Sequence, residues 1–131
     1  MNENTYNNNV LEKDFEKLST LYDRDELRFF VDSSKQMVKE INFANVSNVL
    51  DLATGTGNVI LEIIDKKPEC CITGIDISDS MLLKAKEKLR DKQNVTLKRQ
   101  DMESLKSIEN SYDLVTCAFG TYFVNKLDWF F

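Results

Sequence analysis

The stretch Val-Leu-Asp-Leu-Ala-Thr-Gly-Thr-Gly-Asn at positions 49–58 joins an apolar run ending in an acid to a turn of small residues, and an apolar helical pattern follows it. Gly55 and Gly57 can adopt positive φ, and without a Cβ they let the backbone approach a ligand closely. A helix predicted from about residue 57 to 67 would point its unpaired N–H groups into the same space. The stretch therefore predicts either a nucleotide-binding turn or a strand–turn–helix corner whose glycines serve geometry alone.

An acidic residue further along the chain favours the nucleotide-binding turn. Pro68 ends the predicted helix, and residues 70–77 have the β-branched composition of a second buried strand. Asp76 lies at the end of that strand, 21 residues after Gly55, where doubly wound nucleotide-binding units place the carboxylate that binds ribose. The alternative is that Asp76 begins a turn or caps the next helix, but the residues at 78–80 already supply capping oxygens.

The rest of the chain continues the alternation of strands and helices. Apolar residues at helical spacing occupy 12–41, where one or two helices should pack on the sheet or cover a ligand. Further strands are predicted at 46–53, 94–99 and 113–119, with at most a short helix at 103–108. A helix over 79–91 should present one apolar face, made of Met81, Leu82, Ala85 and Leu89. This alternation predicts an α/β fold with parallel strands.

Four stretches in order resemble class I S-adenosylmethionine-dependent methyltransferases. They are residues 49–57, residues 74–78 with Met81-Leu82, residues 100–102, and residues 112–120. The ending Ala118-Phe119-Gly120 resembles the branch that methylates quinone rings in ubiquinone and menaquinone biosynthesis. The dehydrogenase pattern Gly-x-Gly-x-x-Gly is absent because position 60 is Ile, which disfavours an NAD-binding interpretation.

The resemblance implies a Rossmann-like sheet with strand order 3-2-1-4 and S-adenosyl-L-methionine as cofactor. Asp51 would orient the methionine end of the cofactor through its amino group or a water, and Asp101 would bind the adenine amino group unless it is an ordinary loop residue. Met81 would contact the adenine or belong to the core. The implied cofactor-binding residues are Asp51, Ala53, Thr54, Gly55, Gly57, Asp76, Ile77, Met81, Asp101, Met102 and Cys117.

The chain departs from that family in two places. Thr121-Tyr122-Phe123 stands where the quinone branch has Leu-Arg-Asn, and the sequence stops at Phe131, before the later strands of the family fold. The asparagine-rich start of the chain predicts a disordered N-terminus at 1–11. The early stop predicts a partial cofactor-binding domain at 12–131, which would be an expressed fragment, a natural truncation or a half-domain completed by another chain. The exposed edge of the fourth strand would then be a surface for a homodimer. No catalytic base is assigned; Tyr122 is suggested by position alone.

Composition excludes several function classes. The net charge of −5, from 17 basic and 22 acidic residues, disfavours general nucleic-acid binding. With no histidine, a metal site and a Ser-His-Asp system are not expected. No apolar stretch approaches the about 20 residues of a membrane span. Cys70, Cys71 and Cys117 are predicted to be small core residues of a cytoplasmic protein.

A basic cluster accompanies the helix predicted at 79–91. It alternates with two acids, so we predict a solvated helix face rather than a phosphate-binding surface. Its members are Lys84, Lys86, Lys88, Arg90 and Lys92.

Two main function classes follow from these observations, and an NAD-type nucleotide binder is a third, weaker alternative. The first is a methyltransferase with a small, quinone-like aromatic acceptor, and the second is a binding module that holds the cofactor or its product without catalysis. Since the methyl donor is already a strong electrophile, the first class needs little beyond alignment of the reacting groups.

Overall fold

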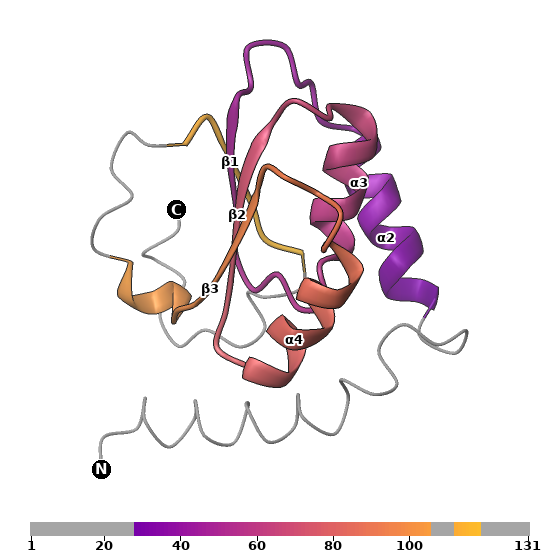
Figure 1. The fold of residues 1–131 in the computed structure, drawn as a ribbon. Coiled ribbons are helices and arrows are strands. Elements are labelled where there is room, and N and C mark those ends of the chain that lie inside the picture. The colour runs from indigo at the N-terminus through magenta and orange to yellow at the C-terminus, as the bar shows by residue number, and fades with distance from the viewer. Residues whose placement is uncertain (1–27, 106–111, 119–131) are drawn as a thin grey trace.

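The structure is a computed structural model that describes residues 28–105 and 112–118 (Figure 1). Four parallel strands form one sheet in the order β3-β2-β1-β4, which confirms the predicted α/β fold and strand order. The elements in chain order are α2 (Arg28–Lys39), β1 (Asn48–Asp51), α3 (Asn58–Lys66), β2 (Cys71–Asp76), α4 (Asp79–Lys88), β3 (Val95–Arg99), the 3-10 helix η2 (Met102–Ser104) and β4 (Leu114–Thr116).

Several predicted boundaries agree with the structure within one residue, but three elements are shorter than predicted. The strand expected at 113–119 covers only 114–116 and ends before Cys117 and Ala118. The strand expected at 46–53 covers only 48–51, because Ala53 turns the chain with φ 52° directly after β1. The helix expected at 79–91 ends at Lys88, since Leu89 has left helical geometry at φ −105° and ψ 10°. The predicted segments 12–27, 106–108 and 119 lie outside the described residues.

The two central strands, β1 and β2, carry buried residues on both faces of the sheet, whereas β3 has no buried residue and Val115 of β4 is exposed. Val49 and Ile72 face a core formed with apolar residues of α2, α3 and α4. Leu50, Leu52 and Ile75 face the opposite side. They pack against apolar residues of the segments on either side of β4, which are Met102, Leu105, Tyr112 and Cys117. Figure 1 shows α2 and α3 side by side on one side of the strands. The face predicted for α4 is confirmed, because Met81, Leu82, Ala85 and Leu89 are all buried.

Lys66, in the last turn of α3, fixes the end of α2. Its ammonium donates hydrogen bonds to the carbonyls of Val38, Lys39 and Ile41 at 3.0, 3.1 and 2.8 Å. The last carbonyls of a helix have no partner within the helix, so a lysine from a neighbouring helix can satisfy them. This contact holds α2 against α3 and thereby sets the position of α2 relative to the turn that follows β1.

The prediction that all three cysteines are buried is wrong for two of them. Cys70 is fully buried, but Cys71 is exposed and Cys117 is half-buried. Cys71 begins β2, and side chains alternate between the two sides of a strand, so it points away from the core that Ile72 enters. All three are free thiols.

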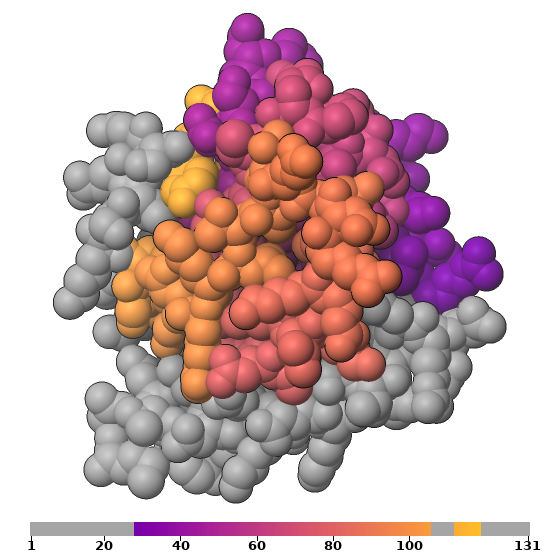
Figure 2. Space-filling model, viewed as in Figure 1, coloured from indigo at the N-terminus to yellow at the C-terminus, as the bar shows by residue number. Residues whose placement is uncertain are grey.

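The basic cluster is also not uniformly solvated. Figure 2 shows α4 and β3 over the near face of the molecule, and Lys86 and Arg90 are exposed as predicted. Lys88 instead turns its ammonium to the segment between β1 and α3, where it is hydrogen-bonded. Within the described ranges, the helices are too short or too polar to span a membrane.

Candidate functional site

The carboxyl ends of the strands bring the predicted residues together at one edge of the sheet. Asp51 ends β1 and stands level with Gly74 of β2 and Thr116 of β4. Asp76 ends β2 two residues further on, and Asp101 follows the end of β3. Ligands of open α/β sheets bind at this edge, where the order of the strands reverses between β1 and β4.

The turn between β1 and α3 is held in an uncommon backbone conformation. Gly55 and Gly57 have φ values of 57° and 88°, as the sequence predicted, and Ala53 adopts φ 52° as well. The N–H of Thr54 donates to the carbonyl of Ile75, and the N–H of Gly55 donates to Oδ2 of Asp76, both at 2.8 Å. The end of β2 therefore fixes the turn through two backbone hydrogen bonds.

Gly57 is required by packing as well as by its backbone angle. A Cβ at this position would lie 2.9 Å from Cδ1 of Leu89 and 3.5 Å from the Cβ of Ala85. The first distance is shorter than carbon–carbon contacts normally are, so the Leu89 side chain would have to shift, and φ 88° would strain any residue with a Cβ. The sequence predicted Gly57 from ligand access, and the structure adds this contact with α4 as a second reason.

Both oxygens of Asp76 accept backbone hydrogen bonds. Oδ2 accepts from Gly55 and Oδ1 accepts from the N–H of Ser78 at 2.9 Å, while the residue is 6% exposed. The hydroxyl of Ser78 caps α4 by accepting from the N–H of Met81, which agrees with the predicted capping role. Asp76 therefore joins the turn after β1 to the start of α4.

Asp51 is a buried acid with an altered pKa. It is 1% exposed, and its oxygens accept hydrogen bonds from the hydroxyls of Thr54 at 2.5 Å and Thr116 at 2.7 Å. Burial raises the pKa of Asp51 from 3.8 to about 6; the two hydroxyls oppose this rise, and the nearby charge of Asp76 adds to it. Near neutral pH the site therefore holds a buried negative charge, a feature typical of functional sites.

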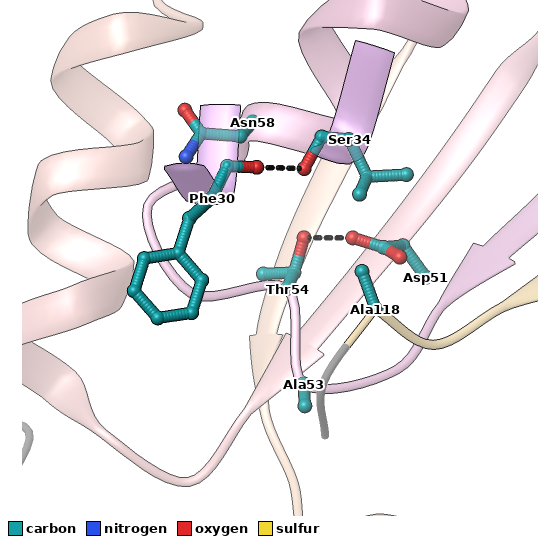
Figure 3. Close-up of a pocket in the computed structure, with 8 residues that line it drawn as sticks. Phe30, Ser34, Asp51, Ala53, Thr54, Asn58 and Ala118 are labelled. Atoms are coloured by element: carbon teal, nitrogen blue, oxygen red, sulfur yellow. Dashed lines mark hydrogen bonds between the residues drawn. The ribbon is translucent and has the colours of Figure 1, made fainter. Parts of the chain in front are cut away.

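A small pocket opens beside Asp51 (Figure 3). Its empty volume, including the open mouth, is about 290 Å³. In Figure 3, Thr54 and Asp51 are joined by their hydrogen bond, and Ser34 of α2 donates to the carbonyl of Phe30. The lining residues are Phe30, Ser34, Asp51, Ala53, Thr54, Asn58, Val59 and Ala118.

Sequence reasoning missed the contribution of α2 and α3 to this pocket. The helical spacing predicted that a helix would cover the sheet or the ligand, but it did not identify Phe30 and Ser34 as lining residues. Asn58 belongs to the quoted stretch and was not singled out. Its position as the first residue of α3, directly after the glycine-rich turn, was the available signal.

The remaining predicted residues lie around the edge and in the cores. Oδ1 of Asp101 accepts the N–H of Glu103 at 2.9 Å and caps η2, so the ordinary loop role is present. Met81 is 1% exposed and belongs to the core side of α4.

The other predicted residues lie on the far side of the sheet or beyond the described residues. Met102 and Cys117 pack on the Leu50 side of the sheet. Ile77 is half-buried, and Tyr122 lies outside the described residues. Among the described residues, no group of His, Cys, Asp and Glu is arranged to hold a metal ion.

We expect Ala53→Gly to raise the free energy of unfolding by roughly 0.5–1 kcal/mol. A left-handed conformation costs a residue with a Cβ about 1–2 kcal/mol, and the greater unfolded-state entropy of glycine offsets part of that relief. Thermal unfolding should show a rise of roughly 2–4 °C. Ala44→Gly is the matched control, because Ala44 is exposed and has no positive φ. An Ala53→Gly protein no more stable than the wild type would show that φ 52° is not strained here.

Comparisons with known proteins agree with this geometry. A family model described as a methyltransferase domain matches residues 49–130. Demethylmenaquinone methyltransferase of Thermotoga maritima is 36% identical over 110 residues, which cover 81% of this chain and 47% of that protein. A ubiquinone/menaquinone biosynthesis C-methyltransferase of Geotalea daltonii is 36% identical over 72% of this chain and 43% of its own length. The chain thus spans less than half the length of these relatives.

Solved structures share the fold. Phosphoethanolamine N-methyltransferase 1 of Haemonchus contortus, solved with phosphoethanolamine and S-adenosylhomocysteine, has a TM-score of 0.69 at 17% sequence identity. The match covers 85% of this chain and 25% of that one. At this identity the likeness supports the arrangement of strands and helices and not the acceptor.

Proposed function

Because the chain belongs to the S-adenosylmethionine-dependent methyltransferases, whose domain model covers residues 49–130, we propose that the site at the end of β1 binds S-adenosyl-L-methionine and that the protein methylates a small, quinone-like aromatic acceptor. The observation that carries the proposal is the buried carboxylate of Asp51. Within the described part of the chain its hydrogen-bond partners are two neutral hydroxyls, and no cation pairs with it.

The chemistry of the site fits the cofactor. S-adenosylmethionine carries its transferable methyl group on a positively charged sulfonium, and its amino acid end carries an ammonium. A buried anion at the pocket favours a cationic ligand, because a charge in a low-dielectric site interacts strongly. Two backbone N–H groups fix the Asp76 carboxylate at the end of β2, which supports its proposed role as the acceptor for ribose hydroxyls.

The proposed contacts extend beyond the two acids. The turn would approach the cofactor through its backbone, Asp101 would accept from the adenine amino group, and the half-buried residues after each strand would surround the adenosine. The proposed set is Asp51, Ala53, Thr54, Gly55, Gly57, Asp76, Ile77, Met81, Asp101, Met102 and Cys117. The proposal also includes Ser34 and Asn58, because both line the pocket beside Asp51.

The proposed acceptor class rests on the relatives. Both curated relatives described above are quinone-biosynthesis methyltransferases by name. Attack by a ring carbon on the methyl group is helped when a neighbouring ring hydroxyl is deprotonated. These 131 residues contain no histidine, so a base within them would be Asp, Glu, Tyr, Lys or Cys.

Isothermal titration of the purified chain with S-adenosylhomocysteine tests the proposal. Saturable binding at one site is expected, with stronger thermal stabilisation by S-adenosylhomocysteine than by NAD. Transfer of labelled methyl from S-adenosylmethionine to a demethylated naphthoquinol should follow. Failure of a folded chain to bind would overturn the proposal. Binding without transfer to any aromatic acceptor would leave only the non-catalytic binding module.

Self-association through β4 is part of the proposal. Within the described sheet β4 pairs with β1 along one edge, and an unpaired strand edge is a ready surface for a second strand. Analytical ultracentrifugation of the 131-residue chain should show a concentration-dependent dimer. A monomer at all concentrations would contradict it without affecting the cofactor proposal.

A further inference from the structure

Lys88 connects the end of α4 to the glycine-rich turn, across 30 residues of sequence. Its ammonium donates to Oδ1 of Asn58 at 2.6 Å and to Oγ1 of Thr56 at 3.1 Å. Thr56 is fully buried between the two left-handed glycines, and Asn58 is the first residue of α3 and lines the pocket beside Asp51. A single side chain therefore contacts both flanks of Gly57.

From this geometry we propose that Lys88 is a positioning residue, which holds the turn in the conformation that receives the cofactor. This inference rests on the proposed binding of S-adenosylmethionine at that turn. Lys88 acts through Thr56 and Asn58 and is not assigned any contact with the cofactor. No motif in the sequence marks it, because it lies within a run of lysines that alternate with acids.

The two hydrogen bonds from the end of β2 hold the turn at Thr54 and Gly55, and Lys88 supports its other end, at Thr56 and Asn58. Ala53, Gly55 and Gly57 all have positive φ, a region that costs free energy for alanine and entropy for glycine. Gly57 is also the N-cap of α3 and offers no side-chain hydrogen bond to the helix. The conformation must therefore be stabilised from outside the turn.

The end of α4 supplies this support by two kinds of contact. Leu89 and Ala85 pack closely on Gly57, where a Cβ would displace the end of the Leu89 side chain, and Lys88 adds the polar bonds beside them. The position is unfavourable for a lysine on electrostatic grounds, because helix N-termini such as that of α3 carry positive partial charge. The oxygens of Asn58 and Thr56 accept from the ammonium and so oppose this repulsion.

Lys88→Met tests the proposal, because methionine keeps the apolar stem and removes the ammonium. We expect its dissociation constant for S-adenosylhomocysteine to rise about tenfold. Hydrogen exchange without ligand should become faster at the Gly57 and Leu61 amides, which are bonded to Thr54 and Gly57. Exchange in β2 should be unchanged. Lys86→Met is the matched control: Lys86 is exposed on the same helix and should alter neither readout.

Variants of Asn58 distinguish positioning from general stability. Asn58→Asp should keep the wild-type exchange rates at the Gly57 and Leu61 amides, since a carboxylate oxygen accepts the same bond from Lys88. Asn58→Ala should weaken binding. If the two residues act together, the total loss of affinity in the Asn58→Ala, Lys88→Met double variant should be smaller than the product of the two single-variant losses. A double variant whose loss of affinity equals the product of the two single losses would overturn the proposed action of Lys88 through Asn58.

The outcomes separate this inference from the proposed function. If the wild-type chain does not bind S-adenosylhomocysteine, the proposed function fails, and the exchange rates still decide whether Lys88 supports the turn. If the wild type binds and Lys88→Met binds within twofold of it with unchanged exchange, the positioning role is overturned.

Discussion

Asp51→Asn is expected to stabilise the ligand-free protein at pH 8 by about 2 kcal/mol and to weaken binding of S-adenosylhomocysteine by 10- to 100-fold. The ionised carboxylate is buried without a cationic partner among the described residues, so a neutral amide removes a desolvation cost. The same amide lacks the charge that would bind the ligand ammonium, and a charged hydrogen bond is worth about 1.5–3 kcal/mol. Thermal unfolding and isothermal titration measure the two effects separately.

The pH dependence of stability follows from the direction of the same shift. The pKa of Asp51 is about 6 in the folded chain and near 3.8 when unfolded, so between these values the folded state binds more protons. Asp51 contributes roughly 2–3 kcal/mol to the free energy of unfolding. This contribution is fully present below pH 4 and is lost as the pH rises through 6. Comparing wild type with Asp51→Asn isolates this slope from those of other groups.

Ligand affinity should show the opposite trend. As the pH falls through 6, Asp51 becomes neutral and binding of S-adenosylhomocysteine should weaken, whereas Asp51→Asn should bind equally from pH 5 to 7. Asp113→Asn is the control. Two backbone N–H groups lower the pKa of Asp113, and it lies at the amino end of β4, so its loss should reduce stability and leave affinity unchanged. A destabilised Asp51→Asn protein would contradict the assignment.

Asp76→Ala should lower both stability and affinity. The substitution leaves the N–H groups of Gly55 and Ser78 without their acceptors, and an unsatisfied buried donor costs about 1–3 kcal/mol. We expect the free energy of unfolding to fall by about 2–5 kcal/mol, which corresponds to a fall in Tm of at least roughly 8 °C. The dissociation constant for S-adenosylhomocysteine should rise at least tenfold, through the lost ribose contact and the released turn.

Measurement at a temperature well below the Tm of the variant keeps folding and binding apart. Asp79→Ala is the matched control, since Asp79 is exposed, lies three residues further along, and pairs only with the exposed Arg99 at 2.9 Å among the described contacts. An exposed pair of this kind contributes little to stability. An Asp76→Ala chain with unchanged affinity would show that Asp76 is a structural anchor of the turn alone.

Local sequence patterns determined the elements and their order. The apolar runs that end at Asp51 and Asp76, the small-residue turn and the apolar face of α4 each depend on neighbouring residues or on helical and strand periods. Because parallel strands share their carboxyl ends, the meeting of Asp51, the turn and Asp76 at one edge followed from the same patterns. Their contacts with a cofactor stay predictions.

Tertiary structure decided what depends on contacts between distant segments. Residue spacing could not show that Leu89 fills the space beside Gly57, that Cys71 begins its strand on the exposed side, or that α2 brings Ser34 to the pocket. Nor could it distinguish Lys88 from the solvated lysines around it, because its role is set by the position of two oxygens 30 and 32 residues away. Sequence periodicity determined which face of an element is buried, and only the packed chain determined which atoms meet there.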